Sequence, residues 1–169
     1  MGSSNVIVGD AATDTAIKTI SAPEAGGSQT FISYPHGISI NSDIDRIVVT
    51  STVRPSDLGA PGETVSVIEA STGKVLSTHK LSDTASPSGV SPVEAVFLPN
   101  AEPALVYVNN MFGGNVWAGV WDSGDSQFKF RQVFDFVPTQ QGVPLEIYFN
   151  HKHDKNVYHN GQPWLPRRF

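Results

Sequence analysis

The sequence predicts an all-β protein made of four-stranded antiparallel blades of the β-propeller type. A seven-residue pattern beginning with proline occurs three times, at Pro35, Pro92 and Pro144, with 57 and 52 residues between the starts. A repeat of that length built from short strands is typical of propeller blades. The chain also has 15 glycines and 12 prolines, as a turn-rich β fold requires. No segment keeps apolar residues at helical spacing over three turns.

The proline pattern marks the first strand of each blade, here called strand a. It reads PHGISIN, PVEAVFL and PLEIYFN, and each copy precedes a short turn and a second strand, b. The three b strands are expected at 46–50, 104–108 and 156–159. β-branched and aromatic residues fill these segments, and such residues favour pleated, half-buried strands.

A second repeated unit supplies strands c and d. Its copies pair 5–8 with 15–20, 65–68 with 74–78, and 116–121 with 128–133. The turns between them contain Gly, Asp, Ser and Thr, which are hairpin residues. Some of the aromatic residues in the last copy, such as Phe128 and Phe130, are two positions apart, which indicates packing between blades.

The order of these units predicts one partial propeller over residues 1–169. It comprises a half blade at 5–21, blades at 35–81 and 92–136, a half blade at 144–160 and a C-terminal tail at 161–169, about three blades in total. Propellers usually have 4–8 blades, so three do not close a ring. The chain could be part of a longer propeller, an open arc, or half of a six-bladed ring made by two copies. We therefore expect self-association or a missing remainder of the propeller.

Loop lengths predict which rim carries function. The a–b and c–d turns are short, whereas the connections at 21–35, 51–63, 82–92 and 109–115 are long and rich in Pro, Gly, Asn and Ser. The long connections should share one rim. Binding groups concentrate in loops on a rigid scaffold, so this long-loop face is the expected working face.

Three side chains are candidates for chemistry at the start of strand a. Glu94 and Glu146 occupy the third position of the proline pattern, where the first copy has Gly37, and His36 precedes that glycine. Strand a is innermost in a propeller, so these side chains should meet at the mouth of the central channel. They could bind a divalent metal ion, act as general acid and base, or cap backbone N–H groups.

Two further polar segments contain candidate site residues. Asn109 and Asn110 begin a connection with an apolar tip and are candidate ligand-binding residues. His151, His153 and Asp154 form an H-x-H-D sequence that looks like a metal motif, but the repeat places it in a short a–b turn, where a solvated turn is the better interpretation.

Composition excludes several classes of function. A formal net charge of −5 argues against a nucleic-acid-binding surface. The absence of cysteine removes disulfides and thiolate nucleophiles. No signal peptide is visible and no apolar run is long enough to span a membrane, so we expect a soluble protein, with the cytoplasm slightly favoured.

Short segments resemble known propeller families. LVYVNN at 105–110 and PHG at 35–37 resemble the strand and blade-opening motifs of YVTN and lactonase-like propellers. VPLEIYFNH at 143–151 resembles the P-L-E-I-x-F-x-H stretch of the selenium-binding protein family, whose members include methanethiol oxidases. That resemblance implies a seven-bladed propeller and, in the oxidases, copper held by histidines. Only Glu146 and His151 match the family stretch, and the family's histidine-rich motifs and cysteines are not recognisable here.

The sequence thus predicts a propeller-family protein that binds a small molecule or a metal on the long-loop face. The alternatives are a metal-dependent oxidase of the methanethiol oxidase type, a lactonase-like hydrolase, or a scaffold for protein partners. A divalent metal ion is the cofactor that the candidate residues suggest.

Overall fold

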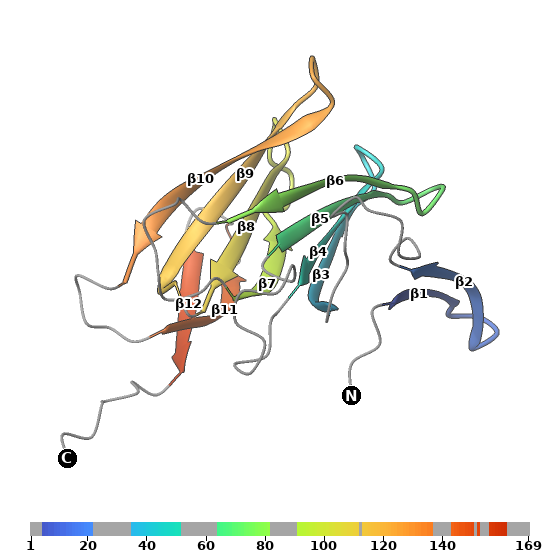
Figure 1. The fold of residues 1–169 in the computed structure, drawn as a ribbon, viewed down its shortest axis with the longest axis horizontal. Helices are drawn as coiled ribbons and strands as arrows, with labels where there is room; N and C mark the ends of the chain where they lie inside the picture. The colour runs from blue at the N-terminus through green and yellow to red at the C-terminus, as the bar shows by residue number, and fades with distance from the viewer. Residues whose placement is uncertain are drawn as a thin grey trace.

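A computed structural model describes residues 5–21, 35–51, 64–81, 91–111, 113–136, 143–150, 152 and 156–161. Within these ranges all regular structure is β-strand (Figure 1). The strands are β1 Asn5–Asp10, β2 Thr15–Ser21, β3 Pro35–Asn41, β4 Arg46–Ser51, β5 Thr64–Glu69, β6 Val75–Lys80, β7 Pro92–Phe97, β8 Leu105–Asn110, β9 Asn115–Asp122, β10 Gln127–Asp135, β11 Val143–Phe149 and β12 Asn156–Gly161.

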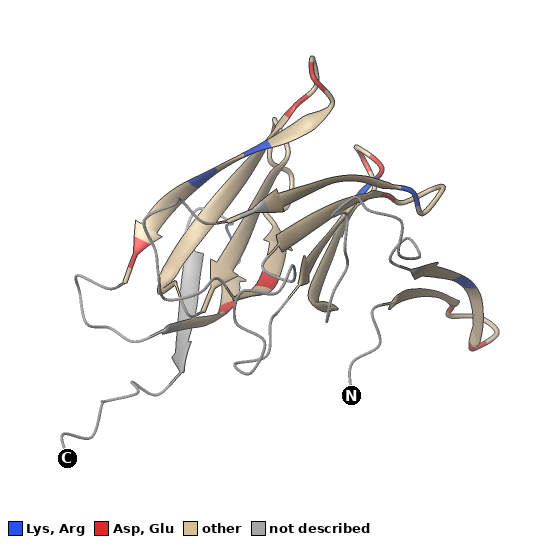
Figure 2. Cartoon of the chain, in the orientation of Figure 1, with Lys and Arg blue, Asp and Glu red and all other residues tan. Residues whose placement is uncertain are grey.

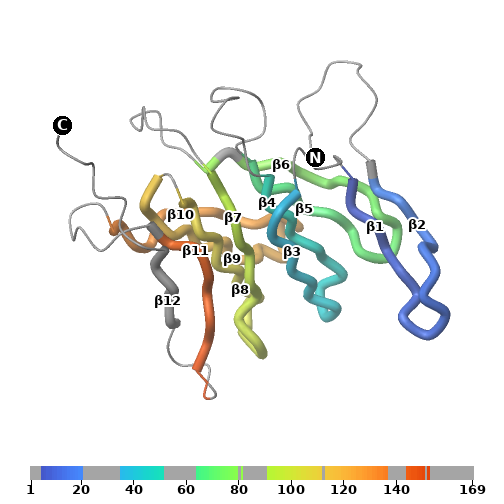
Figure 3. Tube along the Cα trace, turned by 90° about the horizontal axis from the view of Figure 1, so that it is seen from below, coloured from blue at the N-terminus to red at the C-terminus, as the bar shows by residue number. Residues whose placement is uncertain are grey.

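The strands form two complete blades and two strand pairs. β3–β6 make the first four-stranded sheet and β7–β10 the second, and each strand pairs antiparallel with its neighbour in sequence. β1–β2 and β11–β12 form separate two-stranded sheets. Figure 3 shows the inner strands β3, β7 and β11 side by side, with β11 at one end of the row and β1–β2 at the other. The all-β, propeller-type prediction is confirmed.

Each inner strand begins with the same irregularity. The pairing register of strands a and b shifts between Pro35 and Ile38, between Pro92 and Glu94, and between Pro144 and Glu146. A β-bulge of this kind bends the strand and redirects the side chains beside it. The repeated proline pattern therefore encodes a repeated backbone bend at the mouth of the arc.

Two apolar clusters hold the sheets together. The larger lies between the two complete blades and joins side chains such as Val48 and Val67 to Phe97, Val106 and others. The smaller packs Val6 and Ile20 of β1–β2 against Ile47, Val49 and Ile68 of the first blade. The second cluster places β1–β2 against β4 and β5 of that blade.

The inner strands approach most closely at Gly37. A Cβ added there would lie 2.6 Å from the Val93 carbonyl oxygen and 2.7 Å from Glu94 Cα. Glycine is thus required at this position because the backbone of β7 occupies the space that a side chain would need. Ser39 Oγ accepts a hydrogen bond from the N–H of Phe97 at 3.1 Å and fixes the same pair of strands further along.

Candidate functional site

The inner strands bring the three predicted side chains into neighbouring positions. His36 lies on β3, Glu94 on β7 and Glu146 on β11, each beside the bulge of its strand. His36 and Glu146 are exposed and Glu94 is half-buried. Glu94 interacts electrostatically with both of the others. We call these three side chains the mouth cluster.

His36 is oriented by a backbone carbonyl. Its Nδ1 lies 2.8 Å from the carbonyl oxygen of Val93. Because that oxygen can only accept, Nδ1 carries a hydrogen, which leaves Nε2 as the ring nitrogen that can present a lone pair. Histidines that bind a metal through one ring nitrogen commonly donate the N–H of the other nitrogen to a carbonyl or carboxylate oxygen, which orients the ring.

The same carbonyl anchors the first blade to the second. Val93 also accepts a hydrogen bond from the buried hydroxyl of Thr50 at 3.0 Å, and Thr50 Oγ1 accepts from the N–H of Gly37 at 2.8 Å. His36 and Thr50 therefore share one acceptor on β7, and the contacts of Thr50 hold β3 and β7 in the position that His36 needs.

Glu94 links the second blade to β11. Its Oε2 accepts a hydrogen bond from the N–H of Ile147 at 2.6 Å. Partial burial raises the pKa of Glu94 above its ordinary value and the nearby charge of Glu146 raises it further, while the Ile147 N–H and His36 act in the opposite direction. The other carboxylate oxygen has no hydrogen-bond partner among the described residues.

The exposed carboxylate of Glu146 accepts a hydrogen bond from a hydroxyl group on its own strand. The Tyr148 hydroxyl donates a hydrogen bond to Glu146 Oε2 at 2.7 Å. The carboxylate raises the pKa of Tyr148, because the negative charge favours the protonated phenol. The mouth cluster thus offers carboxylate oxygens and an imidazole lone pair, which are all acceptors.

Asn109 lies deeper than the sequence suggested. It belongs to β8 and stands opposite Glu94 in the β7–β8 register. The side chain is 0% exposed, and neither its Oδ1 nor its Nδ2 has a hydrogen-bond partner among the described residues. A buried amide without partners costs about 1–3 kcal/mol, and such groups are rare outside functional sites and water sites.

Asn110 has a structural environment instead of an exposed one. Its Oδ1 accepts from the N–H of Ser91 at 2.7 Å, and its Nδ2 donates to Asn115 Oδ1 at 3.1 Å. The segment expected to be an open loop is a tight turn, since the N–H of Gly114 bonds the carbonyl of Met111. Its geometry assigns Asn110 to this turn, and the expectation of a ligand-binding role has no support from its contacts.

The sequence predicts a metal site at His36, Glu94 and Glu146, and the structure shows how these side chains are grouped. In the described ranges, no three or more His, Cys, Asp or Glu side chains lie close enough together to hold a metal ion. His36, Glu94 and Glu146 are neighbours but do not form a closed ligand set, so a metal there needs further ligands. His151, His153 and Asp154 lie outside the described residues.

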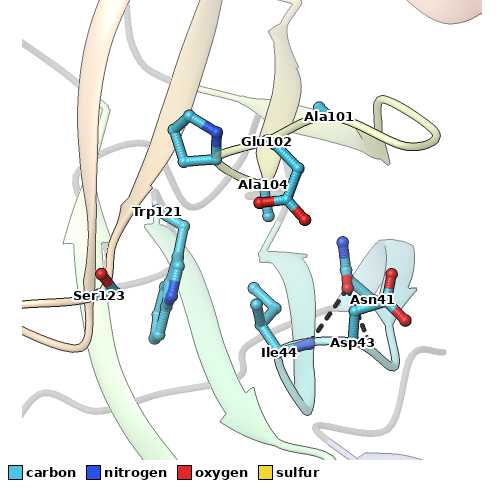
Figure 4. A pocket seen from close by; sticks show the side chains of 9 residues that line it. Asn41, Asp43, Ile44, Ala101, Glu102, Ala104, Trp121 and Ser123 are labelled. Atoms are coloured by element: carbon cyan, nitrogen blue, oxygen red, sulfur yellow. Dashed lines mark hydrogen bonds between the residues drawn. The ribbon is translucent and has the colours of Figure 1, made fainter.

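A cavity on the opposite rim was not predicted. It has a volume of about 220 Å³ and lies between the a–b turns of the two complete blades and β9 (Figure 4). Trp121, Ile44 and Ala104 supply apolar walls, and Glu102 and Asn41 face one another across it. The cavity is smaller than the ~300–1,000 Å³ of usual small-molecule sites.

Charges gather at the hairpin tips around this rim (Figure 2). Asp45 accepts hydrogen bonds from Ser71, which lowers its pKa, and Asp122 lies 3.0 Å from Lys129. Glu102 has no partner among the described residues. Sequence reasoning missed the cavity because it forms between two turns 57 residues apart in the repeat.

Comparisons with known proteins give information about the fold alone. No protein-family model and no curated protein matches the chain. The solved hydrazine synthase of Kuenenia stuttgartiensis aligns with a TM-score of 0.59 at 15% identity, over 92% of this chain and 35% of that one. A PQQ-bound aldose sugar dehydrogenase from Streptomyces coelicolor aligns with a TM-score of 0.45 at 19% identity, over 72% of this chain and 36% of that one.

The chain thus spans about a third of the length of the structures that it resembles. The hydrazine synthase alignment supports a propeller-type architecture and nothing finer, because identity is so low. Among the described residues, no helix has the length and hydropathy needed to cross a membrane.

Proposed function

We propose that this propeller-type protein binds a small cation, either an organic ammonium compound or a divalent metal ion, at the mouth cluster. The observation that carries the proposal is the gathering of acceptor groups on neighbouring inner strands: the Nε2 atom of His36 and the carboxylates of Glu94 and Glu146. Two carboxylates favour a positively charged ligand, and both an ammonium group and a metal ion can bind carboxylate oxygens and an imidazole nitrogen.

Partial burial strengthens this argument. Glu94 is half-buried, and this burial raises its pKa because it removes water from around the ionised carboxylate. A bound cation would stabilise the ionised form and return part of the lost solvation. The unpartnered amide of Asn109 opposite Glu94 extends the polar site inward, where an ordered water or a ligand group would satisfy it.

Calorimetry with defined probes tests the proposal. Mn²⁺, Zn²⁺ and Cu²⁺ form one arm, and ethanolamine and choline form the other, each titrated into the wild type, Glu94→Gln and Glu102→Gln at neutral pH. Glu94→Gln keeps an acceptor for the Ile147 N–H but removes the charge. We expect it to weaken cation binding about tenfold or more, because a hydrogen bond to a charged group contributes about 1.5–3 kcal/mol.

Glu102→Gln is the matched control, because it removes a carboxylate from the cavity on the opposite rim. Binding that survives Glu94→Gln and is lost in Glu102→Gln would move the site to that rim. No measurable binding of any probe would contradict the proposed function.

The metal arm also addresses the enzymatic alternatives. An oxidase of the methanethiol oxidase type or a lactonase-like hydrolase would require the mouth cluster to retain a metal ion. His36, with Nδ1 engaged and Nε2 available, is the observation that favours a metal over an ammonium ligand. Loss of Cu²⁺ or Zn²⁺ binding in His36→Gln with amine binding retained would select the metal.

A further inference from the structure

One face of the first blade is uncovered at its inner strand. Ile38 and Ile40 of β3 are 56% and 63% exposed. The equivalent residues of β7, Ala95 and Phe97, are 2% and 7% exposed, and Ile147 of β11 is 2% exposed. The β7 and β11 residues lie against the inner strand that precedes them, and β3 lacks such a strand among the described residues.

The outer half of the same face is already covered. β1–β2 packs Val6 and Ile20 against Ile47, Val49 and Ile68, which share that face with Ile38 and Ile40. β1–β2 has the register of β5–β6, with the shift at the corresponding place. A c–d pair is therefore in position, and the a–b pair of the same blade is what the uncovered surface lacks.

The other end of the arc offers the complementary piece. β11–β12 is an a–b pair whose register matches β7–β8, including the bulge at its start. Among the described strands β12 pairs only with β11, and β1 pairs only with β2. Unpaired strand edges with apolar neighbours favour pairing with another chain.

We propose that β11–β12 of a second copy completes the blade begun by β1–β2, so that β12 pairs with β1 and β11 covers β3. The same contact made in both directions gives a symmetric dimer. Each chain contributes two complete blades and two halves, and the closed ring then has six blades, within the range of known propellers. The blade-to-blade interface already present in one chain continues across the two copies.

The pairing register between the copies follows from the complete blades. In the first blade Val49 of strand b lies opposite Ser66 of strand c. By the repeat, the corresponding residues are Tyr158 of β12 and Ile7 of β1. Tyr158 of one copy therefore lies opposite Ile7 of the other, which is 63% exposed in the single chain.

The inner strands predict one specific polar contact. Glu94, at the third position of the proline pattern in β7, accepts a hydrogen bond from the N–H of Ile147, at the fourth position of the pattern in β11. Glu146 holds the third position of the pattern in β11, so it meets the N–H of Ile38, at the fourth position in β3 of the second copy. Closure thus places Glu146 where Glu94 stands between adjacent blades of one chain.

Solution mass tests the proposal directly. Size-exclusion chromatography with light scattering should give twice the 18.1 kDa of one chain. Ile40→Lys places a charge on the uncovered surface and should yield a folded monomer, because Ile40 is exposed within one chain. Val133→Lys is the matched control, since Val133 is also an exposed strand residue but lies on the outer strand β10, and this variant should remain a dimer. A monomeric wild type, or a mass other than two chains, would overturn the proposal.

Cross-linking tests the register independently. The chain has no cysteine, so Ile7→Cys with Tyr158→Cys should form an intermolecular disulfide on mild oxidation. Ile17→Cys with Tyr158→Cys is the control, because Ile17 lies on β2, one strand further out, and equally exposed residues there should not pair. Equal cross-linking of both pairs, or none of the first, would refute this arrangement of the copies.

Discussion

Gly37→Ala should separate the first two blades at the mouth cluster. The added Cβ would lie 2.6 Å from the Val93 carbonyl oxygen, 2.7 Å from Glu94 Cα and 3.0 Å from the Ala95 nitrogen. All three are backbone atoms, so no side chain can rotate away. Relief requires β7 to move from β3 by roughly 1 Å, which restores the ~3.5 Å separation of non-bonded atoms.

The expected cost follows from overpacking. Inserting a methyl group into a close-packed region costs about 1–3 kcal/mol, and the rigid surroundings place Gly37→Ala near about 3 kcal/mol. For a chain of this length that corresponds to a fall in melting temperature of roughly 6–12 °C. The same movement carries the Val93 carbonyl away from His36 and Thr50, so cation binding at the mouth should weaken as well.

Differential scanning calorimetry and urea unfolding measure this cost. Gly9→Ala is the control, because its Cβ would meet the Thr15 carbonyl oxygen at 3.7 Å, an ordinary contact, and it should change stability by less than about 1 kcal/mol. If Gly37→Ala and Gly9→Ala unfold with the same free energy, the close approach of β3 and β7 does not limit side-chain size and the reasoning fails.

Four further outcomes follow from the same contacts. Glu146→Gln removes a like charge and should lower the pKa of Glu94, as followed by carboxyl NMR titration. Folding raises the pKa of Glu94, so its contribution to stability is present below the pKa of the unfolded state and is lost as the pH rises through the pKa of the folded state. Glu94→Gln should therefore gain stability relative to wild type as the pH rises between these two pKa values. A difference in unfolding free energy that does not change with pH would contradict this. Thr50→Val keeps the buried volume but removes the three backbone contacts of the hydroxyl, and it should cost about 1–2 kcal/mol in urea unfolding. Asn110→Ala should cost about 2–3 kcal/mol because it leaves the buried N–H of Ser91 unpaired. An unchanged unfolding midpoint would refute either assignment.

The sequence predicted the architecture because its repeat records local chemistry. A proline, a bulge and a β-branched strand recur at Pro35, Pro92 and Pro144, and each copy forms the same strand pair. The placement of His36, Glu94 and Glu146 on neighbouring inner strands followed from their positions in that repeat, where the two glutamates share the third position and His36 holds the second. Their role as a binding site stays a prediction.

Burial and partner choice depended on the tertiary structure. Asn109 and Asn110 are adjacent and chemically identical, yet one amide is satisfied by a turn and the other is buried without partners, because successive residues of a strand face opposite sides of a sheet. The cavity beside Trp121 and the uncovered face at Ile38 and Ile40 likewise arise from how one sheet lies against the next. A repeat specifies what each blade is made of. Contacts between blades, such as those from Glu94 to Ile147 and from Phe97 to Ser39, join residues more than fifty positions apart, and these distances exist only once the sheets have packed.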